Sequence, residues 1–126
     1  MTTPPLATWE CVVLDCPNPL ELAEFYCALL GGQVNQPDRR WAISDRWATL
    51  HLAGGNVITF QAVDDYVAPN WPDPGFPQQV HLDFHVSSLA AAENVVTANG
   101  GTRLHDNRGW VVFADPAGHP FCLIGN

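Results

Sequence analysis

Three polar side chains at alternate positions, His81, Asp83 and His85, form the pattern in this sequence with the clearest capacity for chemistry. Apolar residues fill the positions between them, and this period of two predicts a β-strand over residues 80–86 with one polar face. Residues two apart on a strand are separated by about 6.6–6.8 Å, so His81 and Asp83 could share one metal ion. His81 and His85 lie twice as far apart, so we do not expect an iron site of two histidines and one carboxylate within this strand alone.

Three roles for His81 remain open at this point. As a ligand of zinc, nickel or iron it needs partners, and two thiolates with one imidazole suit zinc, with Gln61 or water in the fourth place. As a general base in a metal-free pocket it needs only a neighbouring carboxylate, which Asp83 or Asp15 could supply. As a structural residue, it is a strand histidine whose ring is satisfied by the backbone.

The other candidate side chains are a thiol and two further histidines. Cys122 lies between two apolar residues, and the simplest interpretation is a buried apolar thiol. A nucleophilic role would require a histidine or a helix N-terminus that stabilises the thiolate, and His81 is the candidate partner. His51 alternates with a threonine on a predicted strand and could face a cleft, whereas His119 is predicted to be a solvated turn residue.

Five tryptophans are many for a chain of 126 residues. Trp9 and Trp47 fall on predicted strands and are expected in the core. Trp41, Trp71 and Trp110 lie at or beside turns, where an indole ring more often borders a pocket or a subunit contact. A cleft lined by these rings would suit a flat or moderately apolar ligand, and scattered packing aromatics are the alternative.

Composition excludes several classes of function. Thirteen acidic residues against five basic ones give a net charge of −8, and all the basic residues are arginine, so the chain has no lysine for a Schiff base or a phosphate-binding loop. The acid excess argues against nucleic acid or an anionic membrane as partner, because phosphates require clustered cations. No long apolar span and no signal-peptide pattern occur, so we expect a cytoplasmic protein with reduced cysteines.

Hydrophobic periodicity divides the chain into two similar halves. In the first half, Asn18 and Pro19 suit the start of a helix and Gly31-Gly32 suit its end. The first repeat, about residues 7–63, is predicted to comprise a strand over 9–16, a helix through Leu22 and Leu29, and strands over 41–43, 47–52 and 57–63.

A linker over about residues 64–79 separates the halves, since it carries four prolines and few β-branched residues. The pattern then begins again, with Ser87-Ser88 before a helix and Gly100-Gly101 after it. The second repeat, about residues 80–126, is predicted to comprise a strand over 80–86, a helix through Leu89 and Val96, and strands over 102–104, 110–114 and 120–124. Two β-α-β-β-β units in tandem indicate internal duplication.

Motifs in both halves are similar to those of one known superfamily. They are Val13-Leu14-Asp15-Cys16-Pro17, Phe25-Tyr26-x-x-Leu29-Leu30-Gly31, Trp71-Pro72-Asp73, Gln78-Gln79-Val80-His81-Leu82-Asp83, and residues 113–122 around Asp115-Pro116-Ala117-Gly118-His119. With these motifs the chain resembles the vicinal oxygen chelate superfamily, which includes glyoxalase I, bleomycin-resistance proteins and extradiol dioxygenases, and in particular its glyoxalase-like branch.

The resemblance implies an α+β fold of a single domain, residues 1–126, in which the two modules form a curled mixed sheet around a cleft, with the helices outside. It further implies a homodimer, because members of the superfamily commonly complete the cleft with a second copy. Its metal-binding members place ligands on the first and last strand of each repeat. By spacing, these positions here are Cys11, Gln61, His81 and Cys122, and the ion would be zinc, nickel, iron or manganese.

Two functions follow, from different classes. The favoured one is a glyoxalase-like small-molecule-binding protein with an aromatic-lined cleft that needs no fixed metal, because two of the four ligand positions depart from the usual types. The ligand-binding residues would be His81, Asp83, His85, Gln61, Trp41, Trp71, Trp110 and His51. The alternative is a metal-dependent lyase, isomerase or dioxygenase, in which the ion polarises vicinal oxygen atoms of the substrate.

Overall fold

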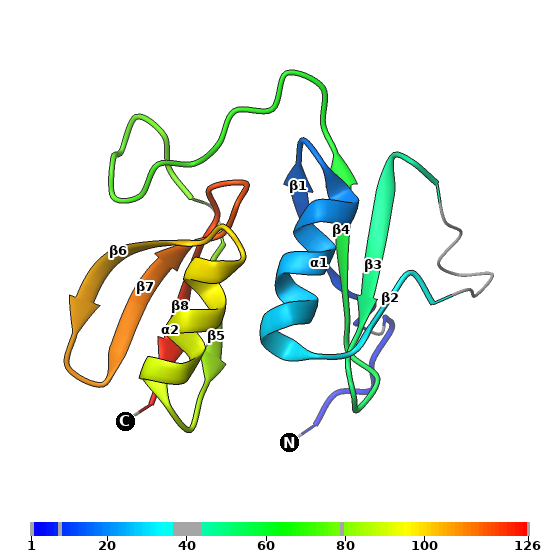
Figure 1. Ribbon diagram of the computed structural model, residues 1–126. Coiled ribbons are helices and arrows are strands. Elements are labelled where there is room, and N and C mark those ends of the chain that lie inside the picture. The colour runs from blue at the N-terminus through cyan, green and yellow to red at the C-terminus, as the bar shows by residue number, and fades with distance from the viewer. Residues whose placement is uncertain (1, 8, 37–43, 79, 126) are drawn as a thin grey trace.

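The computed structural model describes residues 2–7, 9–36, 44–78 and 80–125, and it folds as two β-α-β-β-β modules in tandem (Figure 1). The first module comprises β1 (Val12–Cys16), α1 (Pro19–Leu30), β2 (Gln33–Val34), β3 (Trp47–His51) and β4 (Val57–Ala62). The second comprises β5 (Leu82–His85), α2 (Leu89–Ala98), β6 (Thr102–Asn107), β7 (Trp110–Ala114) and β8 (Pro120–Ile124). The predicted α+β class with two repeated modules is confirmed.

The two modules form separate four-stranded mixed sheets with the same topology. Strand order is β1-β4-β3-β2 in the first sheet and β5-β8-β7-β6 in the second. The first strand of each module runs parallel to the last, and the remaining neighbours are antiparallel. The first strands, β1 and β5, are therefore sheet edges. The predicted strand over 41–43 lies outside the described residues, and the described neighbour of β3 on that side is the two-residue strand β2, which is too short to show periodicity.

Local sequence explains where the helices begin and end. Pro19 occupies the first turn of α1, where its missing N–H is not needed, and Ser88 caps α2 by accepting a hydrogen bond from the Ala91 amide at 3.2 Å. Gly31 ends α1 at a φ of 74°, and the chain turns directly into β2. Gly32 is required there, because a Cβ atom would lie 2.5 Å from the carbonyl oxygen of His51.

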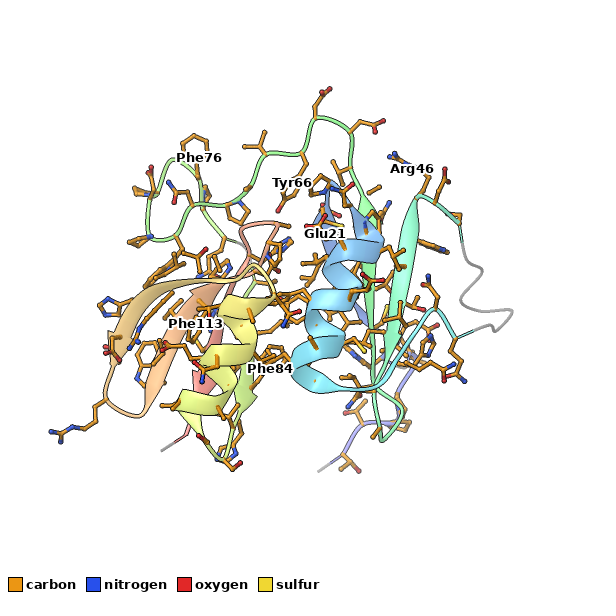
Figure 2. All side chains as sticks on the ribbon, viewed as in Figure 1. Glu21, Arg46, Tyr66, Phe76, Phe84 and Phe113 are labelled. Carbon is orange, nitrogen blue, oxygen red and sulfur yellow. The ribbon has the colours of Figure 1, made fainter. Side chains whose placement is uncertain are left out.

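A shared core joins the modules. The Tyr26 ring on α1 stacks on Phe60 of the first sheet at 5.8 Å and meets Phe84 and Phe121 of the second sheet edge-on, at 6.1 and 5.9 Å. Figure 2 shows Phe84 between the two modules. The helices thus cover one face of each sheet, and the opposite faces carry the polar positions of β1 and β5. Those faces stay partly open to solvent.

The two tryptophans predicted for the core are exposed. Trp9 is 82% exposed, and Trp47 is 36% exposed on β3, so the prediction that they are core residues is wrong. On the other side of β3, Ala48 and Leu50 are buried in the core beneath α1, and Thr49 is buried on the same side as Trp47. Residues 64–78 form the linker, which carries no helix or strand and passes from the end of β4 to the second module (Figure 1). Within the described residues, no helix is long and apolar enough to span a membrane.

Candidate functional site

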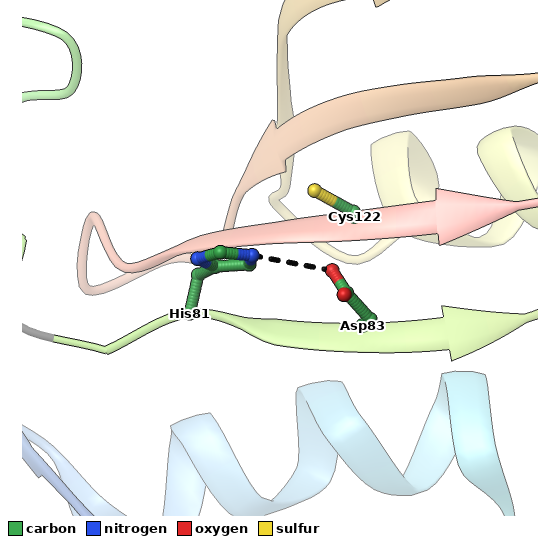
Figure 3. A group of neighbouring side chains, drawn as sticks. All are labelled: His81, Asp83 and Cys122. Carbon is green, nitrogen blue, oxygen red and sulfur yellow. Dashed lines mark ion pairs between the residues drawn. The ribbon is translucent and has the colours of Figure 1, made fainter.

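Three side chains with metal-binding atoms meet on the open face of the second sheet. His81 directly precedes β5, Asp83 lies on β5, and Cys122 lies opposite Asp83 on the parallel strand β8 (Figure 3). The His81 Nε2 atom is 3.4 Å from the Asp83 Oδ1 atom. One ligand atom from each of the three residues lies within 4.8 Å of the other two, and within the described part of the chain this is the one such group of histidine, cysteine, aspartate or glutamate.

Solvent reaches two of these three groups. The side chains of His81 and Asp83 are 46% and 53% exposed, whereas Cys122 is buried. Burial, together with the neighbouring Asp83 carboxylate, raises the pKa of the Cys122 thiol to about 11. The thiol is therefore protonated near neutral pH, which does not favour the nucleophilic role considered for it.

Aromatic side chains enclose this group on one side. Trp71 from the linker, Trp110 at the start of β7, and Gln78 line a cleft with His81 and Cys122. The cleft has a volume of about 160 Å³ and is completed by Val112 and Pro120. The structure thus brings together side chains from the linker, from β7 and β8, and from the residue that precedes β5. Sequence alone singles out His81, Trp71, Trp110 and Cys122, and the tertiary structure adds their proximity.

The other predicted site residues lie outside the group of His81, Asp83 and Cys122. His85 lies at the far end of β5, opposite Ile124, and is exposed. The remaining three described candidates all belong to the first module. The Cys11 Sγ atom lies 3.5 Å from the Thr59 hydroxyl, Gln61 pairs across the strands with Asp15 and Trp47, and the His51 Nε2 atom lies 2.9 Å from the Thr49 hydroxyl. Trp41 lies outside the described residues.

Strand registers show which positions of the two modules correspond. The turn from β3 to β4 and the turn from β7 to β8 contain the same pair of backbone hydrogen bonds. In the first turn, Leu52 N donates to Asn56 O and Gly55 N donates to Leu52 O. In the second turn, Asp115 N donates to His119 O and Gly118 N donates to Asp115 O. Counting from these turns, Cys122 corresponds to Thr59, which opposes Val13 as Cys122 opposes Asp83.

The position equivalent to Cys122 is therefore Thr59 and not Gln61, whose counterpart is Ile124. His81 corresponds to Cys11, as the spacing of the repeats predicts. The group His81–Asp83–Cys122 thus has Cys11, Val13 and Thr59 in the same places of the first module. The sequence-based correspondence between Gln61 and Cys122 is therefore off by two residues. Equivalent residues of the two modules are 70 positions apart in their first strands and 63 positions apart in their last strands. No local sequence pattern reveals this change in spacing.

Comparison with known proteins agrees with this architecture. A family model described as "Glyoxalase-like domain" matches residues 11–124. The chain belongs to the glyoxalase-like domain family. A search of curated protein sequences finds no significant match.

Solved structures share the fold of this glyoxalase-like chain at identities below 20%. A hypothetical protein of S. aureus is 17% identical at a TM-score of 0.69, covering 97% of this chain and 100% of its own. A glyoxalase/bleomycin resistance protein/dioxygenase family enzyme from Burkholderia phytofirmans is 16% identical at 0.67, covering 90% and 94%. The fosfomycin resistance protein FosX from Listeria monocytogenes, complexed with Mn(II) and sulfate, is 15% identical at 0.65, covering 96% and 93%.

A second polar group of the glyoxalase-like domain was missed from sequence. Asp115 is buried and accepts four hydrogen bonds, from the Ala117 and His119 amides, from the Tyr26 hydroxyl at 2.7 Å and from His119 Nδ1 at 2.8 Å. The His119 side chain is 14% exposed, so the prediction of a solvated turn residue is wrong. The Asp-Pro-x-Gly-His turn offered a signal, because a carboxylate four residues before a histidine in a tight turn can bond to its ring.

This group links the two modules and the linker. Tyr26 belongs to α1, and Tyr66 extends from the linker toward the body of the domain (Figure 2), where its hydroxyl donates to Ala117 O at 2.9 Å and lies 3.2 Å from His119 Nε2. Burial and the Asp115 charge raise the pKa of Tyr66 to about 12 and that of Tyr26 well above its ordinary value. Both hydroxyls are therefore neutral donors. With these contacts, Asp115, His119 and the two tyrosines hold α1, the linker and the turn before β8 together.

Proposed function

We propose that this glyoxalase-like protein binds a small apolar or aromatic molecule in the cleft between Trp71 and Trp110. The observation that carries the proposal is the convergence of these two rings on His81 and Cys122 from separate segments of the chain. Two indole faces suit a flat ligand, and the exposed imidazole of His81 supplies a polar anchor next to the Asp83 carboxylate. We treat the two modules as one domain in this function, because they share the core around Tyr26.

The size of the cleft supports a second part of the proposal, a homodimer. Ligand pockets usually measure about 300–1,000 Å³, and this cleft of about 160 Å³ is smaller. The open faces also expose apolar side chains: Val13 is 47%, Trp110 41% and Ile124 38% exposed. Because β1 and β5 are sheet edges among the described strands and lie beside these faces, a second copy packed there would enlarge and enclose the cleft. Light scattering after gel filtration should give twice the mass of one chain.

A metal-dependent lyase, isomerase or dioxygenase is the second candidate, and the three-residue group favours it. The His81 Nε2 and Asp83 Oδ1 atoms are 3.4 Å apart. Two ligand atoms of a tetrahedral zinc ion are separated by about the same distance. Imidazole, carboxylate and thiolate suit zinc or another borderline-soft ion better than manganese, for which a thiolate is too soft. His81, Asp83 and Cys122 would hold the ion. Once bound, such an ion polarises oxygen atoms of a substrate as a Lewis acid.

This chain's own residues would prepare such a site. The His81 Nε2 and Asp83 Oδ1 atoms already lie side by side, so both could bind one ion without rearrangement, while the buried position of Cys122 keeps water away from the sulfur. Trp71 and Trp110 would hold the ligand over the cleft. The four free cysteines support a reducing compartment, and we place the protein in the cytoplasm on that ground.

Elemental mass spectrometry distinguishes the two candidates. Protein purified without chelators or a histidine tag should be analysed together with His81→Ala and with Cys11→Ala, the matched change at the equivalent position of the first module. Near-stoichiometric zinc, nickel, iron or manganese that is lost in His81→Ala and kept in Cys11→Ala would establish the metal-dependent candidate. If all three proteins contain only trace metal, even after incubation with each ion, the metal-dependent candidate is excluded and the metal-free binding protein is supported.

A further inference from the structure

A second, larger cavity lies beneath the linker, and its walls share Gln78 with the cleft at His81. It has a volume of about 410 Å³, within the range of small-molecule sites, and it separates the linker from β1 and from the turn before β8. Apolar and aromatic walls come from Val13, Phe76 and Tyr66, and the polar lining comes from Asp15, Gln78 and His119. The cavity is formed within one chain, so it needs no partner.

One charged acceptor on this cavity is without a partner. Asp15 is exposed, and among the residues that the structure describes its carboxylate makes no ion pair or hydrogen bond. Asp15 lies two residues from Val13 on β1, so both side chains project from the same face of the strand toward the cavity. The Gln78 Oε1 atom also lacks a hydrogen-bond partner among the described residues, but it is buried out of reach of a ligand in the cavity.

The side-chain donors of Tyr66 and His119 on the same walls are already used. Tyr66 donates its hydroxyl proton to Ala117 O at 2.9 Å, and the His119 ring is held between Asp115 at Nδ1 and Tyr66 at Nε2. The charged group that remains available on these walls is thus the Asp15 carboxylate, in a chain of net charge −8. A complementary ligand would carry positive charge next to an apolar body.

We propose that this cavity is a binding site for a small organic ammonium ion, a primary or secondary amine with an aromatic or apolar body. The ammonium group donates to the Asp15 carboxylate. The body of the ligand lies against Val13, Phe76 and Tyr66, where the aromatic faces also attract the positive charge. This inference does not rest on the His81–Asp83–Cys122 group, although Gln78 lines both cavities.

Isothermal titration calorimetry with three probes of one shape tests the proposal. The probes are 2-phenylethylamine, the uncharged 2-phenylethanol and the anionic 3-phenylpropanoate, each titrated into the full chain at pH 7. We expect the amine to bind about tenfold or more tightly than the alcohol, and the carboxylate not to bind, because a hydrogen bond to a charged group stabilises by about 1.5–3 kcal/mol. Equal binding of amine and alcohol, or no binding of the amine, would overturn the proposal.

Variants locate the site. Asp15→Asn keeps the shape of an exposed side chain without partners, so it should fold normally and lose the preference for the amine. The matched control is Asp83→Asn, which removes a carboxylate from the equivalent open face of the other module and should leave amine binding unchanged. If Asp83→Asn weakens the amine and Asp15→Asn does not, the amine binds at the His81 group and the inference fails, while metal analysis of the same variants tests the proposed function separately.

Discussion

The two modules of this protein have the same strand order, the same parallel and antiparallel pairing and the same hydrogen-bonded turn before the last strand. Their open faces nevertheless differ at three corresponding positions. The second module has His81, Asp83 and Cys122, whereas the first has Cys11, Val13 and Thr59. The backbone of a duplicated fold therefore does not distribute chemistry evenly, and the side chains at a few equivalent positions decide which sheet can bind a ligand.

The turns that precede β4 and β8 also differ in side chains that contribute to stability. Leu52 occupies the position in the first turn that Asp115 occupies in the second, and Asn56 corresponds to His119. The backbone hydrogen bonds form in both, so the fold of the turn does not require a carboxylate. What Asp115 adds is the connection to Tyr26 across the module boundary and to the histidine that contacts the linker.

The largest effect is expected from removing that connection. Asp115→Asn replaces a buried carboxylate that accepts four hydrogen bonds, and it leaves the His119 ring and the Tyr26 hydroxyl without their charged acceptor. We expect the free energy of unfolding to fall by about 3–5 kcal/mol, measured by urea denaturation at pH 7. Asp83→Asn, an exposed carboxylate of the same module, is the control and should change stability little. A loss of less than about 1 kcal/mol for Asp115→Asn would mean that the two turns are equivalent after all.

Grafting tests whether the open faces differ only in their side chains. The triple variant Cys11→His, Val13→Asp, Thr59→Cys places the second module's group on the first sheet. If the protein binds metal at His81, Asp83 and Cys122, this variant should bind two Co(II) ions per chain where the wild type binds one. The absorption bands of thiolate-bound cobalt measure the number of ions bound. One ion per chain in a folded variant would show that the registers alone do not make the two faces equivalent.

A smaller effect is expected from the two tryptophans that begin β3 and β7. Trp110 lines the cleft and Trp47 is its counterpart on the first sheet. With 2-naphthol as a flat probe, Trp110→Phe should weaken binding by about 0.5–1.5 kcal/mol, and Trp47→Phe should leave it unchanged, as measured by quenching of the remaining tryptophans. Equal losses in both variants would place the ligand on both faces.

The smallest effect concerns alkaline pH and the linker. Tyr66 has a pKa of about 12 in the folded chain and about 10 when unfolded, so the unfolded state loses its proton first. The stability that Tyr66 contributes is complete below pH 10 and falls as the pH rises through 12. Tyr66→Phe should make the decline between pH 10 and 12 shallower in thermal melts. An unchanged slope would mean that the Tyr66 hydroxyl is not held by Ala117 and His119.

Local sequence pattern determined much of the architecture of this protein. The alternation around His81 and Asp83 predicted a strand with a polar face, and the caps and glycine pairs predicted both helices, because period and capping depend on neighbours a few residues apart. The repeat of these patterns predicted the two modules. The resemblance of motifs such as Asp115–His119 then predicted the family to which the chain belongs.

Only the tertiary structure decided which of these residues meet. Trp71 and Trp110 approach His81 because the linker folds back over β7, and Cys122 lies beside Asp83 because of the register between two strands that are distant in sequence. Thr59 could not be distinguished from Gln61 as the equivalent of Cys122, since both project from the same face of one strand. Trp9 and His119 were misassigned for the related reason that burial depends on what packs against a side chain from elsewhere in the chain, and no local pattern records that.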